Sequence, residues 1–95
     1  MSWYVYILEC VDGSLYTGIA VDVAARYAQH ASGKGAKYTR SHPPRQIMIT
    51  FALPDRSSAS KAEAAIRKLS ALEKRRLISG ERPSDAGWGE RTPIS

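Results

Sequence analysis

Hydrophobic and polar positions form two strand-like runs at the start of the chain. Residues 3–10 are rich in aromatic and β-branched side chains, an Asp-Gly pair follows, and residues 15–20 resume the pattern. This pattern predicts a β-hairpin. A two-residue loop would leave Tyr6 and Tyr16 on opposite faces, whereas a three-residue loop with Gly13 in a left-handed position puts them on one face. We favour the three-residue loop, in which the shared face carries Tyr4, Tyr6, Tyr16 and Gly18.

A helix and a third strand are predicted next. Asp22 is a suitable N-cap for a helix over residues 23–31, which the following serine and glycines would end. Residues 33–45 contain two prolines and no acidic residue, and we interpret them as a basic loop. Residues 45–53 are almost continuously apolar, which is typical of a central strand covered on both faces.

Two further helices are predicted in the second half of the chain. The serines at 57, 58 and 60 offer N-caps for a helix that ends near Leu69. Its apolar stripe would consist of Ala59, Ala62, Ala65, Ile66 and Leu69. Ser70 and Glu73 form a capping-box pattern that opens a short helix ending at Gly80. Residues 81–95 are rich in Gly and Pro without periodicity, which predicts a poorly ordered tail.

The element order ββαβαα predicts an α+β domain over residues 1–80, with a three-stranded antiparallel sheet flanked by helices. Length agrees, because 95 residues with 43% hydrophobic content suffice for one small core. The most apolar stretch, Trp3 to Leu8, is far shorter than the roughly 20 residues of a membrane span. We find no secretory signal at the N-terminus, and the lone Cys10 cannot form an intramolecular disulfide. These features predict a cytoplasmic protein.

Net charge points to a polyanionic partner. The chain has 14 Lys and Arg against 9 Asp and Glu, which gives +5. We interpret the cations of the basic loop as contacts to a nucleic-acid backbone, and Tyr38 as a platform that stacks on a base or sugar. These cations are Lys34, Lys37, Arg40 and Arg45. The glycines of this loop follow a helix and lack the spacing of a nucleotide-binding P-loop. Lys74, Arg75 and Arg76 read as a solvated helix face.

An ordered set of short motifs resembles the GIY-YIG nuclease superfamily. The set comprises Tyr4-Val-Tyr6, Tyr16-Thr-Gly18, Asp22 with Arg26 and His30, residues 33–40, and Glu63 ahead of Ile66-Arg-Lys-Leu69. The similarity covers Trp3 to about Ile78 and is greatest to the small, single-domain, UPF0213-like bacterial branch, which is related to the catalytic domain of the excision-repair nuclease. The resemblance implies a metal-dependent DNA endonuclease that acts in DNA repair or processing.

The resemblance also implies roles for four residues. Tyr6 and Tyr16 take the places of the two motif tyrosines, of which one would accept a proton from the attacking water and the other orient it; their assignment stays open. Arg26 matches the family's helix arginine, whose guanidinium would stabilise charge on the scissile phosphate. His30 would share proton transfer or hold the phosphate; alternatively, it caps carbonyls at the helix end.

Glu63 is the candidate metal ligand. A hard cation such as Mg²⁺ or Mn²⁺ can be held by one carboxylate, substrate phosphate oxygens and water. Glu63 lies among alanines on its predicted helix, and its alternative role is an exposed ion pair with Arg67. Two features depart from the family pattern: Ile19 replaces a lysine that some members carry, and the chain has no asparagine. Lys34, Lys37 and Thr39 are the candidates to substitute.

Two classes of function compete. The first is a divalent-metal-dependent endonuclease, structure-selective or weakly specific because a domain of this size has little surface for reading base edges. The alternative is a nucleic-acid-binding accessory module with little or no turnover. DNA is the expected substrate, RNA stays open because it presents the same phosphates, and weak specificity leaves room for a protein partner that targets the domain.

Overall fold

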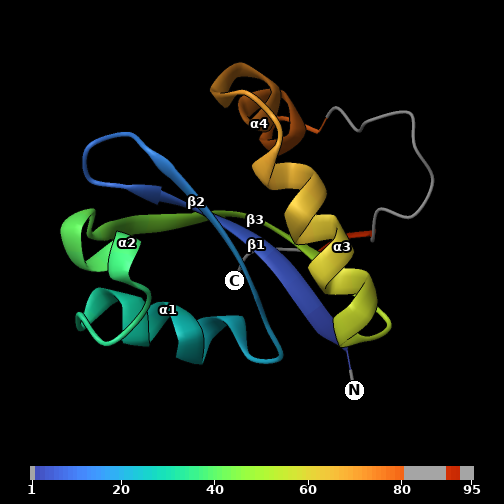
Figure 1. Cartoon of the computed structure of the whole chain (residues 1–95), viewed down its shortest axis with the longest axis horizontal. Coiled ribbons are helices and arrows are strands. Elements are labelled where there is room, and N and C mark those ends of the chain that lie inside the picture. The colour runs from blue at the N-terminus through green and yellow to red at the C-terminus, as the bar shows by residue number, and fades with distance from the viewer. Residues whose placement is uncertain (1, 81–89, 93–95) are drawn as a thin grey trace.

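The computed structural model describes residues 2–80 and 90–92. In chain order the elements are β1 (Trp3–Cys10), β2 (Leu15–Ala20), α1 (Val23–Ala31), α2 (Lys37–Ser41), β3 (Pro44–Leu53), α3 (Arg56–Arg67), α4 (Ala71–Ile78) and β4 (Glu90–Thr92). The strands form one antiparallel sheet in the order β2-β1-β3-β4. Figure 1 shows α1 and α2 to one side of the strands and α3 with α4 to the other. The predicted α+β class, the ββαβαα order and the antiparallel sheet of the first three strands are confirmed.

The hairpin has the predicted three-residue loop. The Cys10 amide donates to the Ser14 carbonyl at 2.8 Å, and the Gly13 amide donates to the Cys10 carbonyl at 2.9 Å. Gly13 has a φ of +84°, a backbone conformation that glycine adopts without steric cost. In the resulting register Tyr6 lies opposite Gly18, and Leu8 lies opposite Tyr16. The two motif tyrosines therefore share one face of the sheet.

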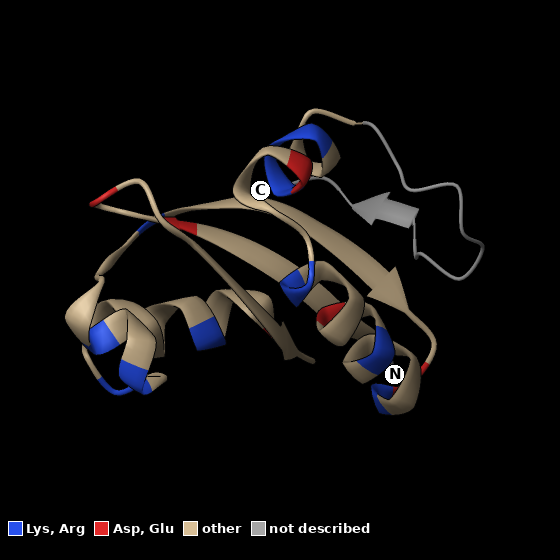
Figure 2. Ribbon diagram, turned by 45° about the horizontal axis from the view of Figure 1, so that its top comes forward, with Lys and Arg blue, Asp and Glu red and all other residues tan. Residues whose placement is uncertain are grey.

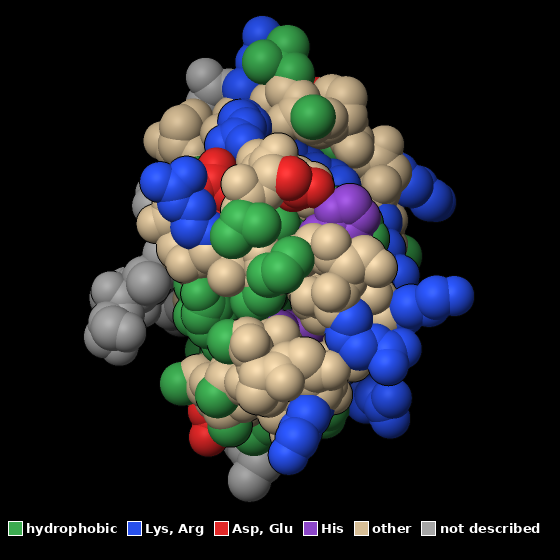
Figure 3. Space-filling view, turned by 90° about the vertical axis from the view of Figure 1, so that its left-hand side faces the viewer, with side chains coloured by type: hydrophobic (Ala, Val, Ile, Leu, Met, Phe, Trp, Pro, Cys, Tyr) green, Lys and Arg blue, Asp and Glu red, His purple; other side chains and the backbone are tan. Residues whose placement is uncertain are grey.

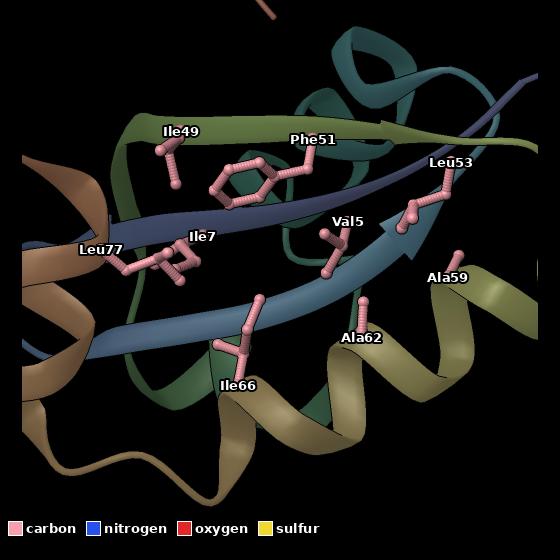
Figure 4. Packing of buried hydrophobic residues seen from close by; sticks show 9 residues of the cluster. All are labelled: Val5, Ile7, Ile49, Phe51, Leu53, Ala59, Ala62, Ile66 and Leu77. Atoms are coloured by element: carbon pink, nitrogen blue, oxygen red, sulfur yellow. The ribbon is translucent and has the colours of Figure 1, made fainter. Parts of the chain in front are cut away.

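The other face of the sheet carries the main apolar core. Val5 and Ile7 of β1 lie opposite Phe51 and Ile49 of β3, and α3 covers these four side chains. Figure 4 shows the nine core side chains pointing toward one another between strands and helices: Val5, Ile7, Ile49, Phe51, Leu53, Ala59, Ala62, Ile66 and Leu77. Their alternation along β1 and β3 follows from the two-residue period of a strand.

Three helices, α1, α3 and α4, begin at residues whose side chains cap the first turn, and the predicted cap of α3 is wrong. Asp22 caps α1 as predicted, and Ser70 with Glu73 forms the predicted capping box of α4. The serines expected to cap α3 do not, because Asp55 accepts the Ser58 amide at 2.7 Å and starts the helix at Arg56. A carboxylate is an equally strong cap and also favours the positive end of the helix dipole. Of the predicted α3 stripe, Ala65 is exposed.

Residues 33–45 are more ordered than the predicted basic loop. They include α2 and the first residues of β3. The prediction missed α2 because a helix of one turn has too few positions for a periodic pattern. Both β1 and β3 are interior strands of the sheet, and among the described residues β3 pairs with β4 over Thr50–Ala52.

The segment predicted as a poorly ordered tail contributes β4, which pairs with β3. The rest of that predicted tail lies outside the described residues. Across the described ranges 2–80 and 90–92, no helix has the length and apolar character to cross a membrane.

Candidate active site

A buried hydrogen-bond chain links β1, α1 and α2. Tyr6 Oη lies 2.9 Å from His30 Nε2, and His30 Nδ1 lies 2.7 Å from Thr39 Oγ1. Thr39 Oγ1 donates its one hydrogen to the Ala36 carbonyl at 2.9 Å. The threonine oxygen therefore accepts from His30 Nδ1–H, which leaves His30 Nε2 as an acceptor for the Tyr6 hydroxyl. Tyr6, His30 and Thr39 are each 1% exposed. Each of them donates to the next group, so the hydrogen bonds run in one direction from Tyr6 to the Ala36 carbonyl.

The protonation states of this chain follow from its burial. Desolvation, with a smaller contribution from the Arg26 charge, lowers the pKa of His30 below its ordinary 6.5. The imidazole is therefore neutral at pH 7 and can accept a proton. Burial, followed by the electrostatic interaction with Tyr16 and, more weakly, with the Glu63 carboxylate, raises the pKa of Tyr6 to about 12, although Arg26 opposes the shift. Tyr6 thus keeps its proton in the free protein, hydrogen-bonded to the one acceptor that can take it.

Two glycines allow these rings to lie where they do. A Cβ at Gly18 would overlap the Tyr6 hydroxyl and approach Tyr6 Cζ to 2.6 Å, so the phenol lies directly over the opposing strand. A Cβ at Gly35 would overlap His30 Nδ1 and approach Cγ to 2.8 Å. Close approach is the physical reason for glycine at both positions.

Arg26 lies next to the Tyr6 hydroxyl. Its positive charge favours the ionised form of the phenol and so opposes the rise in the pKa of Tyr6. Arg26 Nη1 also donates to Gln29 Oε1 at 2.7 Å, one turn along α1, which helps to hold the guanidinium in place. The alternative that His30 caps helix carbonyls is not what the structure has, because both ring nitrogens contact side chains.

Tyr16 belongs to a row of aromatic rings. It contacts His30 edge-on, with centroids 5.2 Å apart, and stacks on Tyr38 at 5.7 Å. Tyr38 in turn stacks on His42 at 4.3 Å, and His42 Nδ1 donates to Asp12 Oδ2 at 2.6 Å. The tip of the hairpin and α2 are thereby joined. The ring faces predicted to stack on a base are engaged within the chain.

Glu63 approaches the cluster from α3. Its charge contributes to the raised pKa of Tyr6, and its side chain is 22% exposed. Arg67 Nη2 lies 3.4 Å from Glu63 Oε2 and 3.4 Å from the Thr17 carbonyl, so the predicted alternative ion pair is present as well. Within residues 2–80 and 90–92, no group of three or more His, Cys, Asp or Glu is placed to hold a metal. A lone, partly exposed carboxylate does fit a cation completed by substrate phosphate and water.

Basic residues lie beside this cluster. Figure 2 shows Lys and Arg on the α1 and α2 side of the sheet and again on α3 and α4. Figure 3 shows Lys and Arg side chains gathered along one side of the end that carries the hairpin tip. Lys34, Lys37 and Arg40 are exposed, whereas Arg45 lies 4.0 Å from Glu9 in an ion pair. The described structure thus leaves the first three available to a polyanion.

The structure brings together Tyr6, Tyr16 and His30, and the charges of Arg26 and Glu63 act on Tyr6. Sequence reasoning named Thr39 only as a substitute for the missing lysine and did not assign it the contact to His30. Thr39 and Gly35 carry no sequence signal of that role, because the contact forms only when α2 folds against α1. His42 could have been suspected as a second imidazole in the basic segment.

Comparisons with known proteins identify the family to which the chain belongs. A family model described as the GIY-YIG catalytic domain matches residues 2–76. The chain is 54% identical over 72 residues to a UPF0213 protein of Cupriavidus pinatubonensis, covering 76% of this chain and 80% of that protein.

Two solution NMR structures are similar to this chain. The UPF0213 protein BH0048 from Bacillus halodurans is 49% identical with a TM-score of 0.54. The protein EF2693 from E. faecalis is 40% identical with a TM-score of 0.59. Each match covers 83% of this chain and 84% of the other. The chain therefore belongs to the GIY-YIG domain family, within which it is similar to the UPF0213 proteins.

Proposed function

We propose that this protein is a divalent-metal-dependent endonuclease that hydrolyses DNA phosphodiester bonds. The observation that carries the proposal is the buried hydrogen bond from Tyr6 to a neutral His30, beside Arg26 and within reach of the Glu63 charge. An acid, a base, a fixed cation and a free carboxylate oxygen are the groups that phosphodiester hydrolysis needs. Weak sequence preference in so small a domain suits the repair or processing of DNA in the cytoplasm.

The proton path runs through Tyr6 to His30. The attacking water gives a proton to Tyr6 Oη as the phenol passes its own proton to His30 Nε2, so the phenolate is never a free species. The water oxygen bonds to phosphorus, the bond from phosphorus to the leaving oxygen breaks, and that oxygen takes a proton from solvent. Arg26 offsets the charge that grows on the phosphate. Tyr16, which packs against His30, would orient the water.

Glu63 would hold the Mg²⁺ or Mn²⁺, which when bound supplies positive charge to the phosphate. Arg67 contacts this carboxylate, whose charge also acts on Tyr6. The weak 3.4 Å contact to Arg67 leaves the carboxylate able to exchange partners when substrate arrives.

Cleavage of defined DNA tests the proposal. Single-stranded, flapped and branched DNA are incubated with the wild type, with Glu63→Gln and with Arg26→Ala, in Mg²⁺, in Mn²⁺ and with a chelator. We expect cleavage by the wild type alone, with a loss of about 10²-fold or more in either variant. Lys61→Gln, an exposed change on the same helix as Glu63, is the matched control. Cleavage that survives Glu63→Gln would overturn the metal site.

The ion pair between Arg67 and Glu63 favours a second candidate, a binding module without turnover, because it gives this carboxylate a structural role. That candidate expects no cleavage by the wild type. It also expects DNA binding that Glu63→Gln preserves or strengthens, because the substitution removes repulsion of phosphate.

A further inference from the structure

A groove leads away from the candidate active site along the start of β2. Two adjoining hollows of about 270 and 310 Å³ share Leu15, Tyr38 and Lys74 as lining residues. The larger hollow also touches Tyr16 and Arg67, so it opens onto the catalytic cluster. The smaller hollow continues to the hairpin tip and the start of α4. Figure 1 shows β2 passing between α2 and α4, which supply the two walls.

The lining of the groove is cationic on one wall and apolar on its floor. Among the residues that the structure describes, no acidic residue lines either hollow. Arg75 is already engaged by Glu9 at 3.2 Å and by the Gly13 carbonyl at 3.0 Å, and Arg67 contacts Glu63. The Lys74 ammonium makes no ion pair within the described residues and lines both hollows. The groove therefore offers one uncommitted positive charge to an anionic ligand.

The opposite wall and the floor suit a sugar and a base. Leu15 is half-buried and Tyr38 is 37% exposed. Because Tyr38 stacks on Tyr16 and His42, it presents an edge to the groove instead of a free ring face. Volumes of this size lie at the lower end of small-ligand sites, at about 300 Å³. A hollow of this size holds one or two nucleotides and is too small to enclose a double helix.

We infer that this groove binds the single-stranded nucleotides next to the scissile phosphate, with a backbone phosphate at Lys74 and a sugar or base against Leu15 and Tyr38. The inference rests on the proposed function, because the scissile phosphate defines the end of the groove at Tyr16. It assigns Lys74 a substrate contact that the sequence interpretation, a solvated helix face, did not. It also names the substrate class: DNA with a single-stranded flank at the cut.

Binding of a fluorescent single strand tests the inference. Anisotropy is measured with a chelator present, so that nothing is cut, for the wild type, Lys74→Ala and the control Lys61→Ala, which lines neither hollow. A blunt duplex of the same sequence serves as the second ligand. For the single strand, we expect Lys74→Ala to reduce the slope of log affinity against log salt by about 0.7, the value for one phosphate contact. Binding of the duplex, and all binding by Lys61→Ala, should match the wild type.

The outcomes separate the inference from the proposed function. Equal single-strand binding by Lys74→Ala and Lys61→Ala, in a chain that cuts DNA, overturns the inference alone. Equal losses on single strand and duplex also overturn it, because the contact would then be a general charge effect. A wild type that shows the Lys74-dependent binding but cuts none of the substrates overturns the proposed function. Thermal melts of both variants check that each is folded.

Discussion

The two faces of the sheet bury their side chains equally deeply, but one face packs apolar groups and the other holds polar groups of the candidate site. On one face Val5, Ile7 and Phe51 are at most 1% exposed and touch apolar groups of α3. On the other face Tyr6 and His30 are also 1% exposed, yet each carries a polar group. A buried polar group costs free energy unless it is hydrogen-bonded. The chain from Tyr6 through His30 to Thr39 meets that condition, and so a reactive group is held in a packed interior.

This difference arises within single strands. Because side chains alternate along β1, Tyr6 lies between Val5 and Ile7 in sequence but on the opposite face. One strand thereby contributes to stability with every second residue and to the candidate chemistry with the residues between. Among the strand residues, we expect substitutions on the α3 face to change stability first and those on the α1 face to change activity first.

The largest expected effect is on the apolar face. Phe51→Ala removes a ring that is 1% exposed in the main core, and it should cost about 3–5 kcal/mol in the free energy of unfolding. That is a large part of the roughly 5–15 kcal/mol available to a domain. Urea denaturation of both chains measures the difference. A loss below about 1 kcal/mol would show that this face is not the source of stability.

Tyr6→Phe should affect cleavage more than stability, which is the opposite of what we expect for Phe51→Ala. It keeps the ring but removes the hydroxyl that bonds to His30, so we expect about 1–3 kcal/mol of destabilisation and a fall in cleavage rate of about 10²–10⁴-fold. Tyr4→Phe is the control, because Tyr4 lies on the same strand and face, opposite Ala20. Cleavage rates and urea curves are compared for all three chains. A cleavage rate that Tyr6→Phe leaves intact removes the proposed relay.

Substitutions at two glycines of the hairpin test whether the position of the Tyr6 ring affects cleavage separately from stability. In Gly18→Ala the new Cβ would collide with the Tyr6 phenol, whereas in Gly13→Ala it meets open space but the backbone keeps a φ of +84°. Overpacking costs about 1–3 kcal/mol, and a left-handed alanine about 1–2 kcal/mol. Stability losses should therefore be similar, but only Gly18→Ala should lose cleavage. Melting temperatures and rates test this pair; equal activities would disconnect the Tyr6 position from catalysis.

Acid should destabilise the protein through His30. The folded pKa of His30 is lowered, mainly by burial. As pH falls below about 6.5, the unfolded chain takes up a proton that the folded chain refuses, so unfolding becomes more favourable. The melting temperature of the wild type should fall from pH 7 to 5 more steeply than that of His30→Gln. Parallel curves would mean that His30 does not stay neutral in the fold.

Local patterns predicted much of the fold, and distant contacts account for the rest. The hairpin register follows from Gly13 and from alternation, and the α1 and α4 caps follow from side chains within three residues of the helix start. β4 was not predicted, since its partner Thr50–Ala52 lies about forty residues earlier.

The candidate site shows the same division between local and distant signals. Its five main residues were named through the family resemblance, but Thr39 bonds His30 across nine residues and Tyr6 bonds it across 24. Alternation and spacing define the face on which each side chain lies. They do not determine which polar atoms of different elements meet once the elements pack together.

The smallest expected effect is the change in stability caused by Thr17→Val on the apolar face, which is compared with the same substitution at Thr39. Thr17 lies opposite Ile7 on the apolar face, is 3% exposed, and its hydroxyl has no hydrogen-bond partner in the described part of the chain. Thr17→Val keeps the shape and removes an unpaired polar atom, so we expect a stabilisation of about 1 kcal/mol with unchanged cleavage.

Thr39→Val removes a hydroxyl that holds both His30 and the Ala36 carbonyl, so it should destabilise the fold by about 1–3 kcal/mol. It should also slow cleavage, because His30 Nδ1–H loses its acceptor and the ring is free to change tautomer. Urea denaturation gives the sign of each change, and nitrogen NMR of the His30 ring reports the tautomer. Opposite signs are the expected result, because the two hydroxyls are buried to similar depth and differ in having partners. The same sign at both positions would show that burial alone, and not hydrogen bonding, separates the two faces.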